Sequence, residues 1–257
     1  MKDKLILITG GSSGIGKAAA KQLFNQGARI ILQARNLDKL KAAATEIDPS
    51  GQQISYYSTD LTDESAVALA ANEIVAKEGI PDVVINSAGA GEWLSFKEAS
   101  PAHFKETMDS PYTATALSCK VFYDKMQERG SGHFIIINSA AAYFSFPGAT
   151  GYTPTRWAML GFAKSLQADL FKSNFTVSTI VLGKVDSPYF TNNPVSEGRI
   201  PKVATLLNPT LSEEAAGRII AKNVRTKRST VIKPTTMAFF VFLNRLFPGV
   251  FRWLMRL

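Results

Sequence analysis

A tyrosine and an arginine four residues apart give the first chemical signal in this sequence. Tyr152 and Arg156 lie in the stretch YTPTRWAML, and this spacing puts both side chains on one face of a helix. A phenol has an ordinary pKa of about 10, so it is a poor base near neutrality unless a neighbouring cation favours the phenolate. The pair therefore indicates a site for proton transfer.

A glycine-rich loop near the N-terminus is suited to a phosphate group. Gly10, Gly14 and Gly16 lie in LITGGSSGIGKAA, which follows an apolar run and opens a helical pattern. Glycines there let the chain turn tightly and approach a pyrophosphate, and the helix N-terminus directs N–H groups at it. Ser12 and Ser13 add hydroxyl donors. A glycine-rich turn without a ligand is the alternative, but the order of strand, loop and helix favours the phosphate site.

The elements that must position these residues alternate regularly along the chain. Short apolar or β-branched runs, typical of strands covered on both faces, span residues 4–9, 29–34, 54–59, 82–87, 133–138, 176–181 and 230–233. Helical spacing is found over 14–26, 36–47, 63–78, 102–126, 156–172 and 212–224. This alternation predicts an α/β fold, a doubly wound parallel sheet of about seven strands with helices on both faces. We expect one domain over residues 1–234 and a tail over 235–257.

Composition argues against several other classes of protein. The 257 residues carry a net charge of +8, but the basic residues are scattered until the C-terminal region, and no aromatic-basic RNA-binding motif is present. We therefore expect no nucleic-acid partner. A lone cysteine, Cys119, excludes an intramolecular disulfide and fits the cytoplasm. No His, Cys and Asp cluster has metal-ligand spacing, so no metal is expected, and His103 and His133 are expected at the surface.

Taken together, the motifs resemble those of the short-chain dehydrogenases/reductases. The loop has their pattern T-G-x-x-x-G-x-G, and TDL at 59–61, NSAG at 86–89, Ser139, Tyr152 and GKVDS at 183–187 agree as well. The resemblance covers residues 4 to about 233 and implies a Rossmann-like fold that binds a nicotinamide dinucleotide. It implies that the phosphates are held by Gly10, Ser12, Ser13, Gly14, Ile15 and Gly16, the adenine by Asp60 and Leu61, the nicotinamide ribose by Asn86, Ala88, Gly89, Tyr152 and Arg156, and the carboxamide by Val185 and Ser187.

The same resemblance implies catalytic roles and reveals two departures from the family. Ser139 and Tyr152 match a serine that donates to the substrate oxygen and a tyrosine that gives or takes its proton. Arg156 stands where the family has a lysine; its charge is permanent, but it cannot release a proton. Pro111 stands where the family has a water-holding asparagine, and a proline there should kink the helix and free a carbonyl. We therefore expect a retuned catalytic set, Ser139, Tyr152 and Arg156, with electrostatic activation and without the lysine's proton relay.

The end of the second expected strand bears on the choice of cofactor. An acidic side chain there would accept from a ribose 2′-hydroxyl and repel a 2′-phosphate. This chain has Ala34 and Arg35 instead, and a guanidinium fork suits a phosphate. Lys17 is expected to help from the first helix. We expect NADP(H) rather than NAD(H); the alternative is that Arg35 is a solvated loop charge.

Aromatic residues gather in the segments expected to contact the substrate, which are 90–96, 140–146 and an insertion after Ser187. They contribute Trp93, Leu94, Phe96, Tyr143, Phe144, Phe146, Tyr189 and Phe190. This uncharged lining favours a small apolar carbonyl or alcohol, although ordinary packing is the alternative for each residue. Within the family the chain resembles membrane-associated reductases of long-chain keto-lipids. The insertion is expected to act as a mobile lid.

The expected function is therefore that of an NADP(H)-dependent oxidoreductase, assembled as a homo-oligomer, that reduces a carbonyl or oxidises an alcohol on an apolar, lipid-like substrate. Two alternatives stay open. One is a cofactor-binding protein with little turnover that acts as a redox-sensing or scaffolding partner. The other is a purely structural protein.

The C-terminal stretch, residues 237–257, is too apolar for a solvated terminus. Its longest uninterrupted apolar run is 237–243, far short of the roughly 20 residues that span a bilayer. Arg245, Arg252 and Arg256 share a helical face if the kink at Pro248 is mild, and apolar residues fill the rest. This amphipathic pattern favours a helix lying on the cytoplasmic face of an anionic membrane. The alternative is docking on its own domain or on a partner subunit.

Overall fold

The apolar runs form a parallel sheet that carries the core. The computed structural model describes residues 1–89 and 91–256, and in it seven strands pair in the order β3-β2-β1-β4-β5-β6-β9. Every neighbouring pair is parallel, which confirms the expected sheet. The strands are β1 Leu5–Thr9, β2 Arg29–Ala34, β3 Ile54–Ser58, β4 Val83–Asn86, β5 Ser131–Ser139, β6 Asn174–Leu182 and β9 Thr230–Lys233. A small separate sheet pairs β7 Val185–Asp186 with β8 Leu211–Ser212.

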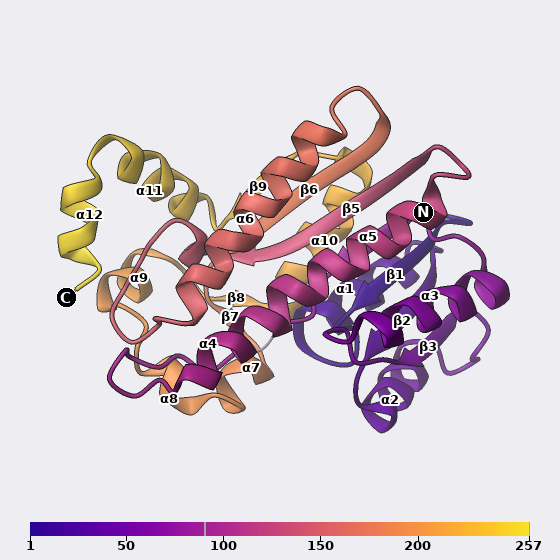
Figure 1. The fold of residues 1–257 in the computed structure, drawn as a ribbon, viewed down its shortest axis with the longest axis horizontal. Helices are drawn as coiled ribbons and strands as arrows, with labels where there is room; N and C mark the ends of the chain where they lie inside the picture. Colours follow the sequence, from indigo (N-terminus) through magenta and orange to yellow (C-terminus); the bar gives the residue numbers. More distant parts are fainter. Residues whose placement is uncertain (90, 257) are drawn as a thin grey trace.

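Helices cover both faces of the sheet because successive strand residues point to opposite sides (Figure 1). Ile6 and Ile8 pack with α1 Gly14–Phe24, α2 Leu37–Ile47 and α10 Glu213–Thr226. Leu5 and Leu7 pack with α3 Glu64–Glu78, α5 Ala114–Met126 and α6 Tyr152–Asp169. The two cores thus fix the sheet between two helical layers.

Side-chain caps define where several of these helices begin. Asn36, Asp63 and Ser212 each accept a hydrogen bond from the backbone N–H three residues later, at the starts of α2, α3 and α10. The expected helix starts at Asp63 and Ser212 agree with this result. The caps place the loops before these helices at the edge of the sheet where β2, β3 and the β7–β8 pair end.

The helix expected over 102–126 is interrupted. It consists of α4 Pro101–Met108, a π-helical segment Asp109–Thr113 and α5. Pro111 has no N–H, so it cannot serve the carbonyl of Thr107 one turn earlier. The hydroxyl of Thr155 donates to that carbonyl instead, at 3.1 Å. The proline therefore ties this interrupted helix to α6, on which Tyr152 and Arg156 lie.

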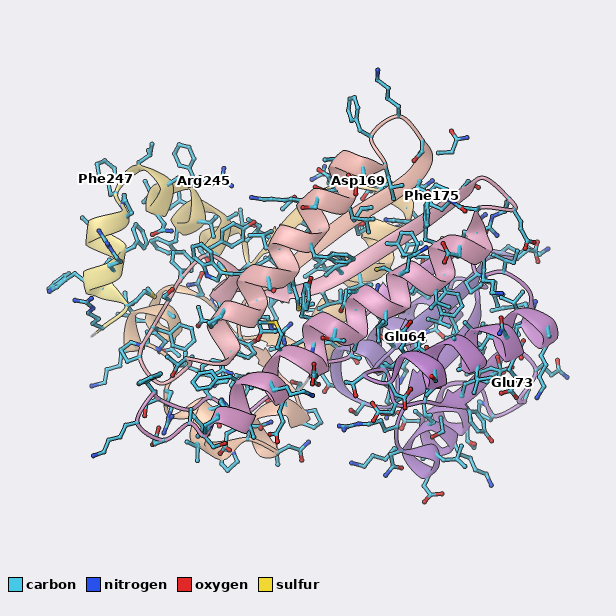
Figure 2. All side chains as sticks on the ribbon, viewed as in Figure 1. Glu64, Glu73, Asp169, Phe175, Arg245 and Phe247 are labelled. Atoms are coloured by element: carbon cyan, nitrogen blue, oxygen red, sulfur yellow. The ribbon has the colours of Figure 1, made fainter. Side chains whose placement is uncertain are left out.

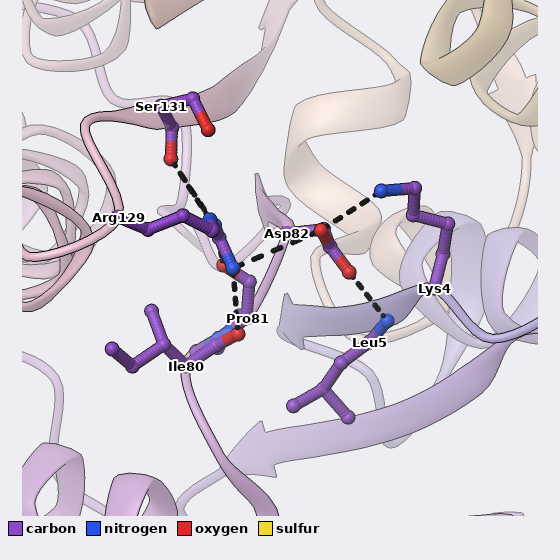
Figure 3. Close-up of polar contacts among 7 residues, drawn as sticks. All are labelled: Lys4, Leu5, Ile80, Pro81, Asp82, Arg129 and Ser131. Carbon is purple, nitrogen blue, oxygen red and sulfur yellow. Dashed lines mark hydrogen bonds and ion pairs between the residues drawn. The ribbon is translucent and has the colours of Figure 1, made fainter.

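An ionic cluster fastens the opposite end of the sheet (Figure 3). Asp82 accepts hydrogen bonds from the Lys4 ammonium at 2.9 Å and from the Leu5 N–H at 3.0 Å. Arg129 lies 3.7 Å from the same carboxylate and donates to the carbonyls of Ile80, Pro81 and Ser131. The cluster joins the start of β1 to the loops that precede β4 and β5.

Two histidines correct the expectation of surface positions. His133 is 2% exposed and lies 2.8 Å from the Ser178 hydroxyl, and His103 is 8% exposed. His133 is buried because β5 is longer than expected and β4 and β6 flank it on both sides. Burial lowers the pKa of His133 from its ordinary 6.5 to about 4.

The insertion and the tail lie on the side of the molecule away from β2 and β3 (Figure 1). The insertion forms α7 Pro188–Thr191, α8 Pro194–Glu197 and α9 Lys202–Leu207, and the tail forms α11 Thr235–Leu246 and α12 Pro248–Leu254. Phe247 has a non-helical backbone, with φ −129° and ψ 59°, so the tail is two helices. The condition of a mild kink at Pro248 is therefore not met, and the three arginines do not share one continuous helical face. No helix in the described residues is long and apolar enough to cross a membrane.

Candidate active site

The carboxyl ends of the strands open into one cavity of about 710 Å³. Sixteen of the residues predicted to bind cofactor or to act in catalysis line it, namely Gly10, Ser12, Ser13, Gly14, Ile15, Gly16, Arg35, Asp60, Leu61, Ala88, Gly89, Ser139, Tyr152, Arg156, Val185 and Ser187. Asn86 is the exception. As the last residue of β4 it is 1% exposed, and its amide donates to Cys119 Sγ at 3.3 Å in the core below.

The loop between β1 and α1 brings the backbone close to the cavity at its glycines, and Ser12 and Ser13 line the cavity beside them. Gly10 and Gly14 have positive φ angles of 68° and 56°, which favour glycine. A Cβ at Gly10 would lie 2.8 Å from Ala88 N, and a Cβ at Gly16 would collide with Gly10 O. The hydroxyl of Thr9 accepts from the N–H groups of Ser87 and Ala88 at 3.2 Å each, which holds this loop against the end of β4.

The end of β2 presents cations to the same cavity. Arg35 is exposed on its wall, together with Asn36 and Lys39. The predicted helper Lys17 does not join them; its ammonium pairs with Glu46 at 2.5 Å. Near Arg35, hydrogen bonds from Thr62 lower the pKa of Asp60, and the Arg35 charge adds to this effect. Asp60 is therefore a charged acceptor at this wall.

Tyr152 and Arg156 meet on α6. They are 7% and 8% exposed, and Arg156 Cζ lies 4.8 Å from the centroid of the Tyr152 ring. The amide of Asn138 donates to the Arg156 carbonyl at 3.1 Å, which fastens α6 to β5. The guanidinium has one further contact, from Nη1 to Met159 Sδ at 3.5 Å, and Nε has no hydrogen-bond partner among the described residues. The arrangement can stabilise negative charge on the phenol.

Close packing holds the arginine in this place. A Cβ at Gly89 would lie 3.4 Å from Arg156 Nη2 and 3.0 Å from Pro111 Cβ. A glycine at 89 therefore leaves the space that the guanidinium fills. Pro111 and Arg156 both lie next to the position of that Cβ, so the two departures from the family pattern are neighbours in space.

Ser139 ends β5 on the same wall. Its hydroxyl accepts a hydrogen bond from Ala141 N at 3.3 Å and so caps the short 3-10 helix Ala140–Ala142. The hydroxyl hydrogen is free to point into the cavity because this bond uses only an acceptor position. The side chain of Asn138 accepts from Ser139 N at 2.8 Å, so Asn138 orders both Ser139 and α6.

Aromatic rings surround the phenol. Trp93 lies 5.0 Å from the rings of both Tyr152 and Phe146, and 6.0 Å from Phe190. Its indole N–H donates at 2.9 Å to the hydroxyl of Tyr189, which itself donates to the Gly91 carbonyl at 2.5 Å. Burial raises the pKa of Tyr189, and Tyr152 beside it adds to the rise, so Tyr189 is a neutral donor.

The predicted substrate-contacting aromatics divide into two groups. Trp93, Phe144, Phe146, Tyr189 and Phe190 line the cavity. Leu94, Phe96 and Tyr143 are absent from its wall; Phe96 is 77% exposed and packs on Phe104 outside it. Ala90, the first residue of the predicted 90–96 segment, lies outside the described residues.

The insertion is fastened across the cavity mouth by contacts that the sequence did not indicate. Arg199 donates to the Trp93 carbonyl at 2.7 Å and pairs with Glu98 at 2.6 Å, and Ser196 accepts from Trp93 N at 2.9 Å. The Arg199 hydrogen bond lowers the pKa of Glu98 to about 2. Between Ser187 and Asn208 the insertion therefore acts as a cover over the aromatic part of the site.

The tail packs on its own domain, as one of the alternatives for it proposed, and it supplies a wall of the cavity that the sequence did not indicate. Met237, Phe240, Phe251, Leu254 and Met255 line the cavity. The excess of apolar residues in the tail was the available signal, but it could not show which surface they cover. Within the described residues no group of three or more His, Cys, Asp or Glu side chains could hold a metal ion.

Comparisons with known proteins agree with this arrangement. The model of the family described as short chain dehydrogenase matches residues 4–197. A 3-dehydrosphinganine reductase of Danio rerio is 28% identical over 223 residues, which are 85% of this chain and 67% of that protein. Dehydrogenase/reductase SDR family member 7B of Danio rerio is also 28% identical, over 98% of this chain and 84% of its own length.

A solved structure shows the same fold. A short chain dehydrogenase/reductase from Burkholderia phymatum, in complex with NAD, has a TM-score of 0.84 and 17% sequence identity. The match covers 97% of this chain and 95% of that one.

Proposed function

Because the chain belongs to the short-chain dehydrogenase family, we propose that it is an NADP(H)-dependent oxidoreductase that reduces a carbonyl, or oxidises the corresponding alcohol, on an apolar, lipid-like substrate. The observation that carries this proposal is the contact between Arg156 and the buried ring of Tyr152, with Ser139 on the same cavity wall. The proposal assigns catalysis to residues 1–234 and treats 235–257 as an added tail.

The cavity fits a dinucleotide. Gly10, Gly14 and Gly16 line the cavity, a Cβ at Gly10 or Gly16 would collide with neighbouring backbone, and the N-terminus of α1 faces this loop. A bound nicotinamide would exchange hydride with the substrate carbon. The cations Arg35 and Lys39 on the wall at the end of β2 support NADP(H), because they suit a 2′-phosphate and no acidic residue occupies the end of that strand.

The protein's own residues would handle the proton. Tyr152 gives its hydroxyl proton to the substrate oxygen on reduction, and Ser139 donates a second hydrogen bond to that oxygen. The charge of Arg156 stabilises the phenolate that is left. Arg156 cannot release a proton, so Tyr152 regains one from water that enters the cavity. In the oxidation direction each of these steps runs in reverse.

The lining of the cavity supports an apolar substrate. Trp93, Phe146 and Phe190 form one apolar cluster with Tyr152; Arg156 lies over the Tyr152 ring, and Lys184 lies 5.5 Å from the centroid of the Phe190 ring. A relative named for reduction of a sphingoid ketone agrees with a long-chain keto-lipid. Such a substrate would lie with its carbonyl at Ser139 and Tyr152 and its chain among the aromatic rings.

The outer side of the tail supports contact with a membrane. Phe239 and Trp253 are 57% and 60% exposed, and Phe242, Leu246, Phe247 and Val250 are also exposed. Arg245 and Phe247 lie on the outer edge of the tail, away from the sheet (Figure 2). We propose that this side lies on an anionic membrane surface. Floating the protein with anionic vesicles checks the proposal; Phe247→Ser with Trp253→Ser should abolish flotation, and Phe171→Ser, at an exposed phenylalanine on the main domain, should not.

The function is tested with a panel of carbonyls that runs from short ketones to a long-chain 3-keto-lipid, each with NADPH and with NADH. The proposal expects NADPH oxidation by the apolar members, with much weaker activity for NADH. A cofactor-binding protein with little turnover would bind NADPH and oxidise it with no member of the panel. Preference for NADH would overturn the assignment of the cofactor.

A further inference from the structure

We infer that the inner side of the C-terminal tail is part of the substrate site and binds the distal part of an uncharged alkyl chain. The inference rests on the proposed function, because it takes the carbonyl of that chain to lie at Tyr152. It concerns a surface different from the exposed outer side of the tail. Its basis is that the residues of α11 and α12 line the same cavity as the catalytic residues.

The topology places the tail at the end of the cavity opposite the cofactor's adenine end. The sheet order runs from β2, which carries Arg35, through β1, β4 and β5, which ends at Ser139, to β6 and β9. The tail follows β9 directly. Gly183, at the end of β6, donates to the Lys233 carbonyl at 2.9 Å, so the start of the tail lies beside the end of β6. A substrate held at Ser139 therefore has the dinucleotide on one side and the tail on the other.

The tail contacts the strip of chain that follows Ser139. Phe144 is 9% exposed and stacks on Phe251 of α12 at 5.7 Å, with 29° between the rings. Ala140, the neighbour of Ser139, packs against the same apolar cluster. The apolar lining thus continues from the catalytic serine to the tail.

Hydrogen bonds fix the tail in this position at two points. The amide of Asn244 donates to the Tyr143 carbonyl at 3.1 Å, and the hydroxyl of Thr236 donates to Asn208 Oδ1 at 2.8 Å. The second bond joins the tail to the insertion that covers the cavity. The two segments therefore form one wall, with the tail on one side and the insertion on the other.

The chemistry of this wall selects the ligand. Its side chains include Ile200, Val203, Met237, Phe240, Phe251 and Met255. Lys184 also reaches the cavity, but its ammonium pairs with Glu197 at 2.7 Å. The apolar side chains of this wall can bury a hydrocarbon chain. The polar residues beside them are engaged within the protein: Asn208 accepts from Thr236 and donates to the Ala204 carbonyl, and Thr205 donates to the Lys202 carbonyl. The occupant is therefore an alkyl chain rather than a sugar or an acidic group.

Two adjacent phenylalanines provide a matched test. Phe240 lines the cavity, whereas Phe239 points outward and is 57% exposed. The affinity of the NADP⁺-loaded, full-length protein for alkan-2-ones of increasing length, from hexan-2-one to dodecan-2-one, is measured by calorimetry without lipid. In the wild type each methylene that becomes buried should tighten binding about fourfold.

Phe240→Ala should weaken binding of the longest ketones by about tenfold and leave hexan-2-one unchanged, while Phe239→Ala should match the wild type at every length. Leu254→Trp, which fills the cavity instead of opening it, should also weaken only the long ketones. Melting temperatures check that each variant is folded. Equal affinities of Phe240→Ala and Phe239→Ala for dodecan-2-one, or a loss for hexan-2-one as large as for dodecan-2-one, would overturn the inference.

The ketone affinities are measured without turnover, so the experiment distinguishes failure of the proposed reaction from failure of the alkyl-binding wall. If the ketones bind with this dependence on length and none of them oxidises NADPH, the proposed reaction fails and the alkyl-binding wall stands. If ketones are reduced at rates that do not depend on Phe240 or Leu254, the reaction stands and the alkyl-binding wall is wrong.

Discussion

Replacing Arg156 by alanine should lower turnover by about 30- to 150-fold. Two unit charges 4.8 Å apart, the distance from Arg156 Cζ to the Tyr152 ring centroid, interact by about 3.5 kcal/mol at an effective dielectric constant of about 20. Part of the phenolate charge lies on oxygen, away from the centroid, so we take the stabilisation of the phenolate by Arg156 as about 2–3 kcal/mol. Each 1.36 kcal/mol corresponds to about a tenfold change in rate.

The assay is single-turnover oxidation of NADPH by the best ketone of the panel, with the affinity for NADPH measured separately. Arg156→Lys keeps the charge and should stay within about tenfold of the wild type, because an ammonium at this position can still face the phenol. The melting temperature of each variant shows whether the loss comes from the site or from the fold. Wild-type turnover in Arg156→Ala, or an equal loss in the lysine and alanine variants, would refute the electrostatic role.

Three other predictions test separate parts of the structure. Arg35→Ala should raise the Kd for NADPH about tenfold and leave the Kd for NADH unchanged. Lys17→Ala, which removes an ion pair with Glu46, should alter neither Kd. An equal loss of affinity for both cofactors in Arg35→Ala would contradict the role of Arg35 at the 2′-phosphate. Arg129→Ala should cost about 2 kcal/mol of unfolding free energy in urea because three carbonyls lose a donor, against less than about 0.5 kcal/mol for Lys77→Ala in an exposed helical pair. Burial lowers the pKa of His133 in the folded protein from its ordinary 6.5 to about 4. As pH drops from 6.5 to 4, the unfolded chain therefore binds a proton at His133 that the folded chain does not, and the free energy of unfolding should fall by up to about 3 kcal/mol. His133→Gln should remove most of this pH dependence.

Much of the fold was predictable because its strands are buried on both faces. The apolar run at 29–34 predicted the observed bounds of β2, Arg29–Ala34. The alternation of apolar runs and helical patterns predicted the seven strands of the main sheet and their alternation with helices along the chain. The interruption before α5 was harder. A kink at Pro111 was expected, but the π-helical segment depends on Thr155 of another helix, which takes the carbonyl that the proline leaves free.

The site also contains residues that the sequence predicted and residues that it did not. Residues in local motifs, such as Gly10 and Gly14, were placed on the cavity because strand, loop and helix are consecutive in the chain. Arg199 and Phe251 were missed because their partners, Glu98 and Phe144, are about a hundred residues away. Asn86 does not line the cavity, because a motif gives the loop's position and not the direction of each side chain. The expected homo-oligomer stays a prediction.

The central claim is that Tyr152 transfers the proton in an NADPH-dependent reduction. The most direct measurement compares wild type with Tyr152→Phe, which keeps the buried ring between Trp93 and Arg156 and removes only the hydroxyl. NADPH binding, followed by its fluorescence, should be unchanged, and turnover of the best ketone should fall by at least about a hundredfold. Turnover at the wild-type rate in a variant that binds NADPH normally would contradict the account.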